Sequence, residues 1–176
     1  MSADVSVRLA WPDDAPQIAA VQRAHWLRSY GETADPEQLE TLDETVMTAR
    51  WSQLISAPRD ARIRTLVALE RAALRGFALV HPCHDPDADQ VRDAEVGEFV
   101  VAVEHQRQGH GSRLLHACVD TIRADGFERI VWWVSPTDDV LRAWLLAAGW
   151  APDGAHREFA ATGGPLKQIR LHTALT

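Results

Sequence analysis

The segment Glu98–Leu115, EFVVAVEHQRQGHGSRLL, constrains the fold more than any other part of the sequence. Its apolar first half is typical of a β-strand, and a polar turn with Gly109 and Gly111 leads directly into an amphipathic helix. A strand, a glycine turn and a helix N-terminus in this order build an anion site, because small residues allow close approach and the first helical N–H groups lack partners. The helix macrodipole adds attraction for negative charge. The segment therefore predicts a site for a phosphorylated ligand.

The composition predicts a soluble globular protein. The chain has 176 residues, 46% hydrophobic and 24% charged, which predicts one domain over residues 1–176. It has no apolar run of the ~20 residues that a membrane span needs, and no signal-like N-terminus, so we expect no membrane association. Two cysteines, Cys83 and Cys118, form no disulfide framework and favour the cytoplasm. The formal net charge of −7 disfavours nucleic acid and mildly favours a cationic partner.

The first third of the chain is predicted to form a short strand and two helices. Alternating apolar residues indicate a strand over residues 5–10, and helical spacing indicates a helix from Ala15 to Gly31. A second helix is predicted from Asp35 to a point before Pro58. Trp26 and Tyr30 lie four residues apart, which places them on one face of the first helix.

The rest of the chain is predicted to alternate between strands and helices. Strands are expected at residues 65–70 and 74–80 as a hairpin, at 94–103, at 129–134, within 150–160 and at 168–175. Helices are expected from Ser112 to Gly126 and over residues 139–148, and a polar loop over 81–93. The strands on either side of the helix that begins at Ser112 should be parallel, with a right-handed crossover. This order predicts a mixed α/β fold.

The glycine turn fits the pattern Q/R-x-x-G-x-G/A over Gln106–Gly111, with Arg107 and Arg113 as nearby positive charges. One alternative is that the two glycines only shape a strand-to-helix turn. A dinucleotide-binding loop is excluded, because it needs G-x-G-x-x-G and an acidic residue about 20 positions further on. The next strand of this chain ends instead in Val134 and Ser135.

On these features the chain resembles the GNAT superfamily of N-acetyltransferases, which bind acetyl-CoA. The resemblance is most specific over Glu98–Leu115, and it continues in residues 138–150, whose ending LLAAGW is similar to the family's helix ending in Gly-Phe. It implies a mostly antiparallel sheet, one parallel strand pair splayed around the CoA slot, and about four helices.

The resemblance also implies which residues bind the cofactor. Backbone N–H groups of the turn would hold the CoA pyrophosphate, and the preceding strand would pair with the pantetheine arm. The implied residues are Val101, Ala102, Val103, Gln106, Arg107, Gln108, Gly109, His110, Gly111, Ser112, Arg113 and Asp138. Among them, an N–H near Val101 is the implied oxyanion donor, Asp138 caps its helix beside the pantetheine arm, and His110 contributes only backbone, with its side chain pointing outward.

Catalytic and substrate residues follow from the same resemblance. Glu98 stands where many family members carry the glutamate that activates the amine, the alternative being a solvent-facing or charge-paired strand residue. Leu145 occupies the position of the usual tyrosine acid, so no general acid is identified. Trp26 and Tyr30 are expected to contact the substrate, or else to pack as ordinary helical aromatics. His156 is expected to reach the acceptor pocket.

Other reactive side chains are expected to be structural. The residues of the loop that could ligate a metal are predicted to be solvated and to hold none; they are His81, Cys83, His84, Asp85, Asp87 and Asp89. Cys118 lies on an apolar helical stripe and should be a core residue. Trp132 and Trp133 alternate across their strand, so one should enter the core while the other faces the slot, and the sequence does not decide which.

The predicted function is an N-acetyltransferase that moves an acetyl group directly from acetyl-CoA to a primary amine of a small molecule or protein, releasing CoA. Glu98 would be the general base. The alternative is a GNAT-like module that binds or senses acyl-CoA, or serves a protein partner, without catalysis; Leu145 motivates it. Late strands in this family commonly pair or exchange between subunits, so the resemblance is compatible with a homodimer, and the oligomeric state stays open. The acceptor amine and a strict preference for acetyl stay open.

Overall fold

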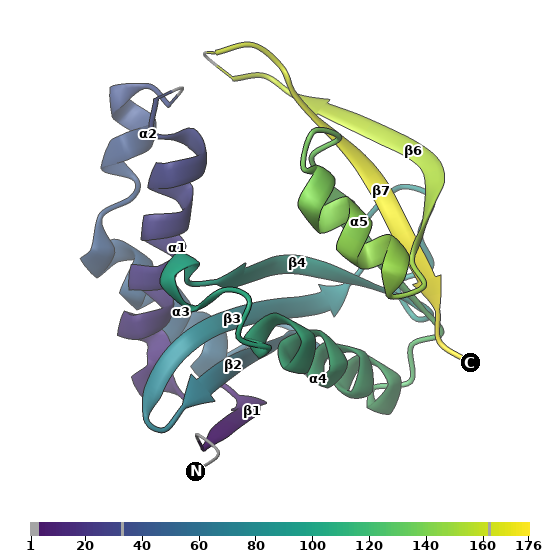
Figure 1. The fold of residues 1–176 in the computed structure, drawn as a ribbon, viewed down its shortest axis with the longest axis horizontal. Helices are drawn as coiled ribbons and strands as arrows, with labels where there is room; N and C mark the ends of the chain where they lie inside the picture. The colour runs from purple at the N-terminus through teal and green to yellow at the C-terminus, as the bar shows by residue number, and fades with distance from the viewer. Residues whose placement is uncertain (1–3, 33, 162) are drawn as a thin grey trace.

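In the computed structural model, which describes residues 4–32, 34–161 and 163–176, seven strands form one sheet in the order β1-β2-β3-β4-β5-β7-β6 (Figure 1). The strands are β1 (Val5–Leu9), β2 (Arg64–Glu70), β3 (Ala73–Pro82), β4 (Asp93–Val101), β5 (Arg129–Val134), β6 (Ala151–Phe159) and β7 (Leu166–Ala174). Each strand region expected from the sequence overlaps one of them. The predicted β2–β3 hairpin turns through Arg71, which adopts a left-handed φ of 57°.

The parallel strand pair predicted from the sequence is β4 with β5, and all other neighbours are antiparallel. β4 pairs with β5 only from Asp93 to Glu95, although it pairs with β3 as far as Val101. The last part of β4 therefore has a backbone edge that β5 does not cover. This separation opens the sheet at its centre.

A β-bulge at Gly97 changes the direction of the side chains that follow it. Val96 pairs with Val80, whereas Glu98 pairs with Leu79, so Gly97 is an extra residue in β4. Residues two apart in a regular strand share a face, and the extra residue shifts this alternation. As a result, Val96 packs in the core on one face while Glu98 lines a cavity on the other.

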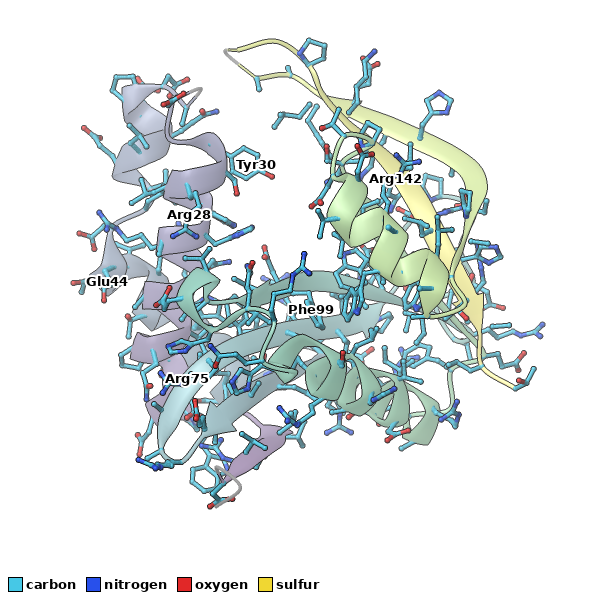
Figure 2. All side chains as sticks on the ribbon, in the orientation of Figure 1. Arg28, Tyr30, Glu44, Arg75, Phe99 and Arg142 are labelled. Carbon is cyan, nitrogen blue, oxygen red and sulfur yellow. The ribbon has the colours of Figure 1, made fainter. Side chains whose placement is uncertain are left out.

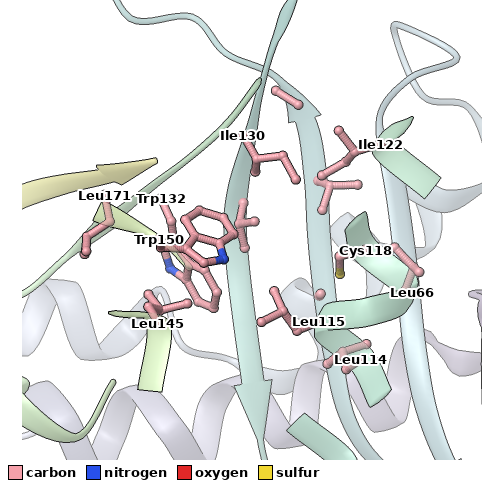
Figure 3. Close-up of a cluster of buried hydrophobic side chains, with 14 of the residues drawn as sticks. Leu66, Leu114, Leu115, Cys118, Ile122, Ile130, Trp132, Leu145, Trp150 and Leu171 are labelled. Carbon is pink, nitrogen blue, oxygen red and sulfur yellow. The ribbon is translucent and has the colours of Figure 1, made fainter. Parts of the chain in front are cut away.

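The helices cover both faces of the sheet. On one face, α4 (His110–Ala124) and α5 (Asp139–Ala147) enclose the larger core, in which Leu114 and Cys118 pack near Trp132 (Figure 3). On the other face, α1 (Ala15–Tyr30) and α3 (Glu44–Ser56) enclose a second core around Trp51 and Phe77. Fully burying one such side chain contributes ~1.5–3 kcal/mol. No helix in the described part of the chain has the length and apolar character needed to cross a bilayer.

The helix predicted from Asp35 to a point before Pro58 is wrong, because two helices occupy this region. The short α2 (Pro36–Glu40) ends, and α3 begins at Glu44. Asp43 separates them, since its Oδ1 accepts a hydrogen bond from the Val46 N–H at 2.9 Å and caps a new helix. The structure thus has five α-helices among the described residues rather than about four.

Two predicted boundaries also move. The helix expected from Ser112 begins already at His110, directly after the glycine that caps it. The strand expected over residues 94–103 ends at Val101 and continues as the 3-10 turn Val103–His105. The two shifts leave the connection between β4 and α4 at residues 102–109, and the glycine turn at 106–109 is exposed.

Candidate active site

The turn between β4 and α4 has the geometry of an anion site. Gly109 is the N-cap of α4 with a φ of 85°, and no side chain accepts a hydrogen bond from the first turn there. The Arg113 guanidinium lies beside Gly109, because a Cβ on Gly109 would be 3.3 Å from both Nη atoms. The first N–H groups of α4, its positive dipole end and this guanidinium therefore converge on one place. Arg107 precedes them with a left-handed φ of 62°.

The two glycines of this turn differ, which gives a test of the site. Gly109→Ala forces a left-handed alanine, at a strain of about 1–2 kcal/mol. An alanine at Gly111 would meet Val101 Cγ2 at 3.7 Å and Trp144 Cζ2 at 4.0 Å, which are ordinary contacts. We expect Gly109→Ala to weaken binding of CoA, measured by calorimetry, about tenfold, and Gly111→Ala to leave it within about threefold. Equal losses in both variants would contradict this geometry.

His110 does not point outward as expected. Its side chain is only 3% exposed, and its Nε2 lies 4.0 Å from Glu70 Oε2. Burial, followed by the charge of Arg113, lowers the pKa of His110. As the first residue of α4 it is directed toward the β2–β3 turn, where Arg75 bonds both Glu70 and His105. The side chain of His110 thus packs near the β2–β3 turn, and only its backbone faces the anion site.

The uncovered edge of β4 leads directly to this turn. The Ala102 N–H donates to the Arg75 carbonyl at 2.8 Å, on the β3 side. Backbone groups alternate along a strand, so those of Val101 point to the opposite, open side. The Val101 carbonyl accepts a hydrogen bond there from Gln106 Nε2 at 3.2 Å. Asp138 caps α5 as expected, accepting from the Leu141 N–H at 3.0 Å.

Two adjoining cavities lie on the α1–α3 side of the sheet. One, of about 240 Å³, is lined by Gln22, Trp26, Thr41, Met47, Arg50, Trp51, Leu54, Leu79 and Glu98. The other, of about 210 Å³, contains Tyr30 and shares Trp26 and Thr41 with the first. Tyr30 projects from α1 toward the space that faces α5 and the β6–β7 hairpin (Figure 2). The structure therefore brings Glu98, Trp26 and Tyr30 together.

Glu98 has the protonation behaviour of a base that works near neutral pH. Burial raises the pKa of its carboxyl group to about 7, and a hydrogen bond from the Gln22 side chain opposes the increase. The partial burial of Tyr30, followed by the charge of Glu98, raises the pKa of the Tyr30 hydroxyl group. No neighbouring cation is among the causes of this pKa, unlike the case of a charge-paired strand residue. Such a carboxylate can accept a proton from an amine.

The structure does not bring His156 to these cavities. His156 is exposed on β6 and pairs with Ile169, which packs against the α4–α5 core on the opposite face of the sheet. It lines neither cavity. Leu145 is fully buried in the same core and has no proton to donate. An acid for the thiolate is therefore not found at that position.

The structure shows which of the two adjacent tryptophans, Trp132 or Trp133, enters the core. Trp132 is buried against Phe99 and Trp150, with ring centroids 4.9 Å and 5.9 Å away. Trp133 lies on the other face, where its Nε1 donates to Asp85 at 3.0 Å. Trp133 is thus part of a polar cluster around Arg170.

Arg170 organises the loop that was expected to be solvated. Its side chain is 5% exposed and binds Asp85 at 3.0 Å, Asp87 at 2.6 Å and Asp153 at 2.7 Å. The expectation of a solvated loop is therefore wrong for Asp85, whose side chain is 11% exposed, and for the buried Cys83, whereas the side chain of Asp87 is 62% exposed. Cys83, Asp85 and Glu95 have ligand atoms within 4.8 Å of one another. Because Asp85 is already bonded to Arg170, we assign Cys83, Asp85 and Glu95 to the ion-pair cluster around Arg170.

The two cysteines are chemically quiet. Both are buried and form no disulfide. Burial raises the pKa of each thiol to about 12, which keeps Cys83 and Cys118 neutral. The prediction that Cys118 is a core residue is confirmed.

Sequence reasoning missed Gln22, Trp51 and Gly97. Gln22 lies four residues after the buried Ile18 on the core-facing stripe of α1, where a polar side chain needs a partner. Gly97 is a single glycine within a strand, a known signal for a bulge. Trp51 carries no such signal, since its apolar helical spacing alone indicates core packing.

Comparison with known proteins agrees with this geometry. No curated protein sequence matches the chain significantly. Among solved structures, an N-acetyltransferase from Staphylococcus aureus is similar at 14% identity and a TM-score of 0.79, covering 99% of this chain and 100% of that one. The Salmonella typhimurium protein YncA, determined with its cofactor acetyl-CoA, is similar at 19% identity and a TM-score of 0.76, with 99% and 95% covered.

A third structure has the same fold. The ribosomal-protein-alanine N-acetyltransferase from Brucella melitensis is 20% identical with a TM-score of 0.78, covering 97% of this chain and 99% of that one. Most directly, the family model for the acetyltransferase (GNAT) family matches residues 20–150. This match includes most of α1, the bulged strand with Glu98, the glycine turn and α5. The chain belongs to the GNAT acetyltransferase family.

Proposed function

We propose that this protein transfers the acetyl group of acetyl-CoA to the primary amine of a small molecule. The observation that carries this proposal is Glu98, a partly buried carboxyl group that lines a cavity and has a pKa of about 7. It lies in a cavity on β4, the same strand whose open edge leads to the anion turn. A base for the amine and a site for the cosubstrate are therefore neighbours on one strand.

The residues of the slot fit acetyl-CoA. Gly109, with its left-handed φ, leaves the α4 N-terminus open for the pyrophosphate, and Arg107 and Arg113 add positive charge. The open edge of β4 at Val101 offers a backbone carbonyl for an amide N–H of the pantetheine arm and a backbone N–H for the thioester. When bound, acetyl-CoA supplies the acetyl group as a reactive thioester.

The protein side of the reaction needs two groups. The ionised Glu98 carboxylate takes a proton from the acceptor ammonium, directly or through a water molecule, which leaves the amine nucleophilic. The Val101 N–H donates a hydrogen bond to the thioester oxygen as negative charge develops there. The amine nitrogen bonds to the thioester carbon, the C–S bond breaks to release the thiolate, and the second proton of the nitrogen passes to water. Leu145 supplies no proton to the thiolate, which is a weaker base than most amines and leaves without one.

The cavity around Glu98 suits a small acceptor with an apolar body. Its volume of about 240 Å³ is below the range of 300–1,000 Å³ that is usual for drug-sized ligands. Trp26, Trp51 and Met47 supply apolar walls, and Arg50 is the cationic side chain among the lining residues. A carboxylate on the acceptor would be attracted to Arg50. These features favour a small molecule over a protein side chain.

The test is release of free thiol from acetyl-CoA in the presence of amines. The panel should contain aliphatic and aromatic amines, each paired with the corresponding amino acid, together with polyamines and short peptides. We expect thiol release with small apolar amines, and kcat/KM should fall about tenfold per pH unit below pH 7 as Glu98 becomes protonated. Thermal stabilisation by acetyl-CoA without thiol release would indicate the non-catalytic module instead.

A further inference from the structure

A cationic side chain lies on the core-facing stripe of α3, where the other residues are apolar. Met47, Trp51 and Leu54 follow one another at helical spacing and line the cavity of about 240 Å³. Arg50 belongs to the same stripe, since it comes three residues after Met47 and four before Leu54, and it lines this cavity as well. Charged residues of such a helix usually lie on the opposite, polar face. The cavity therefore contains a positive charge that the packing of α3 does not require.

The Arg50 guanidinium forms no ion pair or hydrogen bond with the described residues. The residues one helical turn away offer it no carboxylate, since they are Val46, Met47, Gln53 and Leu54. Glu98 is the one acidic residue among the described residues that line the cavity, yet no ion pair joins it to Arg50. Arg50 is also exposed, so the cavity opens to solvent where this residue lies. A negative charge on a bound ligand can therefore reach the guanidinium without displacing a protein group.

Apolar side chains gather around the adjoining cavity of about 210 Å³. Residues of α1, of α2 and of the β6–β7 hairpin line it, and these segments lie at the same end of the molecule (Figure 1). Tyr30, Leu39 and Leu166 are 44%, 36% and 42% exposed there, and none of the described lining residues is charged. Exposed apolar side chains around one hollow are typical of a ligand-binding groove. Trp26 and Thr41 line both cavities, so one small molecule can extend from one into the other.

We infer that the acceptor is an amino acid whose carboxylate pairs with Arg50 and whose apolar side chain occupies the cavity lined by Leu39 and Leu166. Its amino group faces Glu98, and in this respect the inference rests on the proposed function. The three groups of such a molecule match an anion and a cation in the larger cavity and apolar walls in the adjoining one. The charges of Glu98 and Arg50 also set the direction of binding, because reversal would bring like charges together.

The same charges disfavour two other classes of amine. A polyamine would bring a second ammonium group into the cavity that contains Arg50, where like charges repel. A simple alkylamine satisfies Glu98 and the apolar cavity but leaves Arg50 without a partner. Both classes therefore lack the attraction that an amino acid gains at Arg50.

Leucine and isoamylamine, which is leucine without its carboxyl group, form the test pair. In Arg50→Met, which retains an apolar stem, we expect the ratio of kcat/KM for leucine to that for isoamylamine to fall about 10–100-fold, because a charged hydrogen bond is lost. The loss should appear mainly as a higher KM for leucine. Arg50→Lys should retain part of the preference, since an ammonium keeps the charge but not the planar fork of the guanidinium.

Arg59→Met is the matched control for the loss of one positive charge. Arg59 is exposed, has no partner among the described residues and lines neither cavity. The leucine preference should stay within about twofold of the wild-type value, because solvent and salt screen a charge outside the site. CoA binding, which does not involve either arginine, reports whether each variant is folded.

Leu39→Asn tests the apolar end of the acceptor. The wild-type protein should prefer leucine to alanine by about tenfold or more in kcat/KM, because the larger side chain buries more apolar surface. The preference should fall several-fold in Leu39→Asn. Leu9→Asn replaces another exposed leucine, one that lines neither cavity, and should leave the preference unchanged.

Binding without turnover separates this inference from the proposed function. Calorimetry of leucine with the CoA-bound protein requires no acetyl transfer, and the dissociation constant should rise about 10–100-fold in Arg50→Met. If amines are acetylated but Arg50→Met leaves the leucine preference unchanged, or Arg59→Met lowers it equally, the inference is wrong and the proposed function stands. If no amine releases thiol, the proposed function fails. Leucine binding that depends on Arg50 would then still support the inference, and leucine binding that is absent or independent of Arg50 would overturn it.

Discussion

Glu98→Gln should lower kcat at pH 7.5 by about 10²–10⁴-fold and, in the same protein, raise the free energy of unfolding. The loss of turnover follows because an amide cannot accept the acceptor proton. The gain in stability follows because burial raises the pKa of Glu98 from 4.5 to about 7, so ionisation disfavours the folded state. This cost is absent below pH 4.5 and complete above pH 7. We expect roughly 1–3 kcal/mol of stabilisation at pH 8 and almost none at pH 4.5.

Kinetics with the preferred amine and urea unfolding at the two pH values measure both effects. Glu95→Gln is the matched control, because Glu95 is also a carboxyl group on β4 whose pKa is raised by burial, yet it lines neither cavity. It should leave kcat near the wild-type value. Unchanged turnover in Glu98→Gln would remove Glu98 from the mechanism.

Arg170→Met should destabilise the protein by about 3–5 kcal/mol, the usual loss when one partner of a buried ion pair is removed. Arg170 binds Asp85, Asp87 and Asp153, and both Asp85 and Asp153 have side chains only 11% exposed. Without the guanidinium, these two carboxylates keep their desolvation cost with fewer partners. Urea unfolding at pH 7 should show the loss as a lower midpoint.

The dependence of this loss on pH has a defined sign. The hydrogen bond from Arg170 lowers the pKa of Asp87 to about 2, so its contribution is present above the ordinary value of 3.8 and is lost as the pH falls toward 2. The difference between wild type and Arg170→Met should therefore shrink over that range. The control is Lys167→Met, since Lys167 lies on β7 like Arg170 but is exposed and pairs only with Glu158 of β6. It should change stability by less than about 0.5 kcal/mol. Equal losses in the two variants would contradict the assigned role of Arg170.

The elements that could be predicted are those with a local cause. The strand over residues 129–134 is almost continuously apolar, and the helix that begins at Asp139 has an aspartate N-cap. Both form as predicted. The anion turn was also predictable, since Gly109 and the helix after it are adjacent in sequence. In contrast, the segment after Asp35 contains both an unbroken apolar stripe, which favours one long helix, and Asp43, which can cap a second helix. The spacing of the apolar residues does not show which of the two forms.

The acceptor side of the site could not be predicted because its contacts link distant segments. Gln22 and Trp51 lie on different helices, and their hydrogen bond depends on how α1 packs on α3. The cluster around Arg170 likewise joins β7 to a loop more than 80 residues earlier in the sequence. Such pairings are set by the tertiary fold, and the local pattern of a loop rich in aspartate resembles a solvated segment.

Gly97 couples the two halves of the site. Its extra place in β4 turns Glu98 toward the cavity proposed for the acceptor, and it lies just beyond the last residue of β4 that pairs with β5. Even one methyl group at this residue would lie 2.6 Å from the His81 ring. Redesign for a larger acceptor therefore cannot relocate the base along β4 without also reshaping the opening for the cosubstrate. Variation in acceptor choice has to come from α1 and α3, while the strand between the two substrates stays fixed.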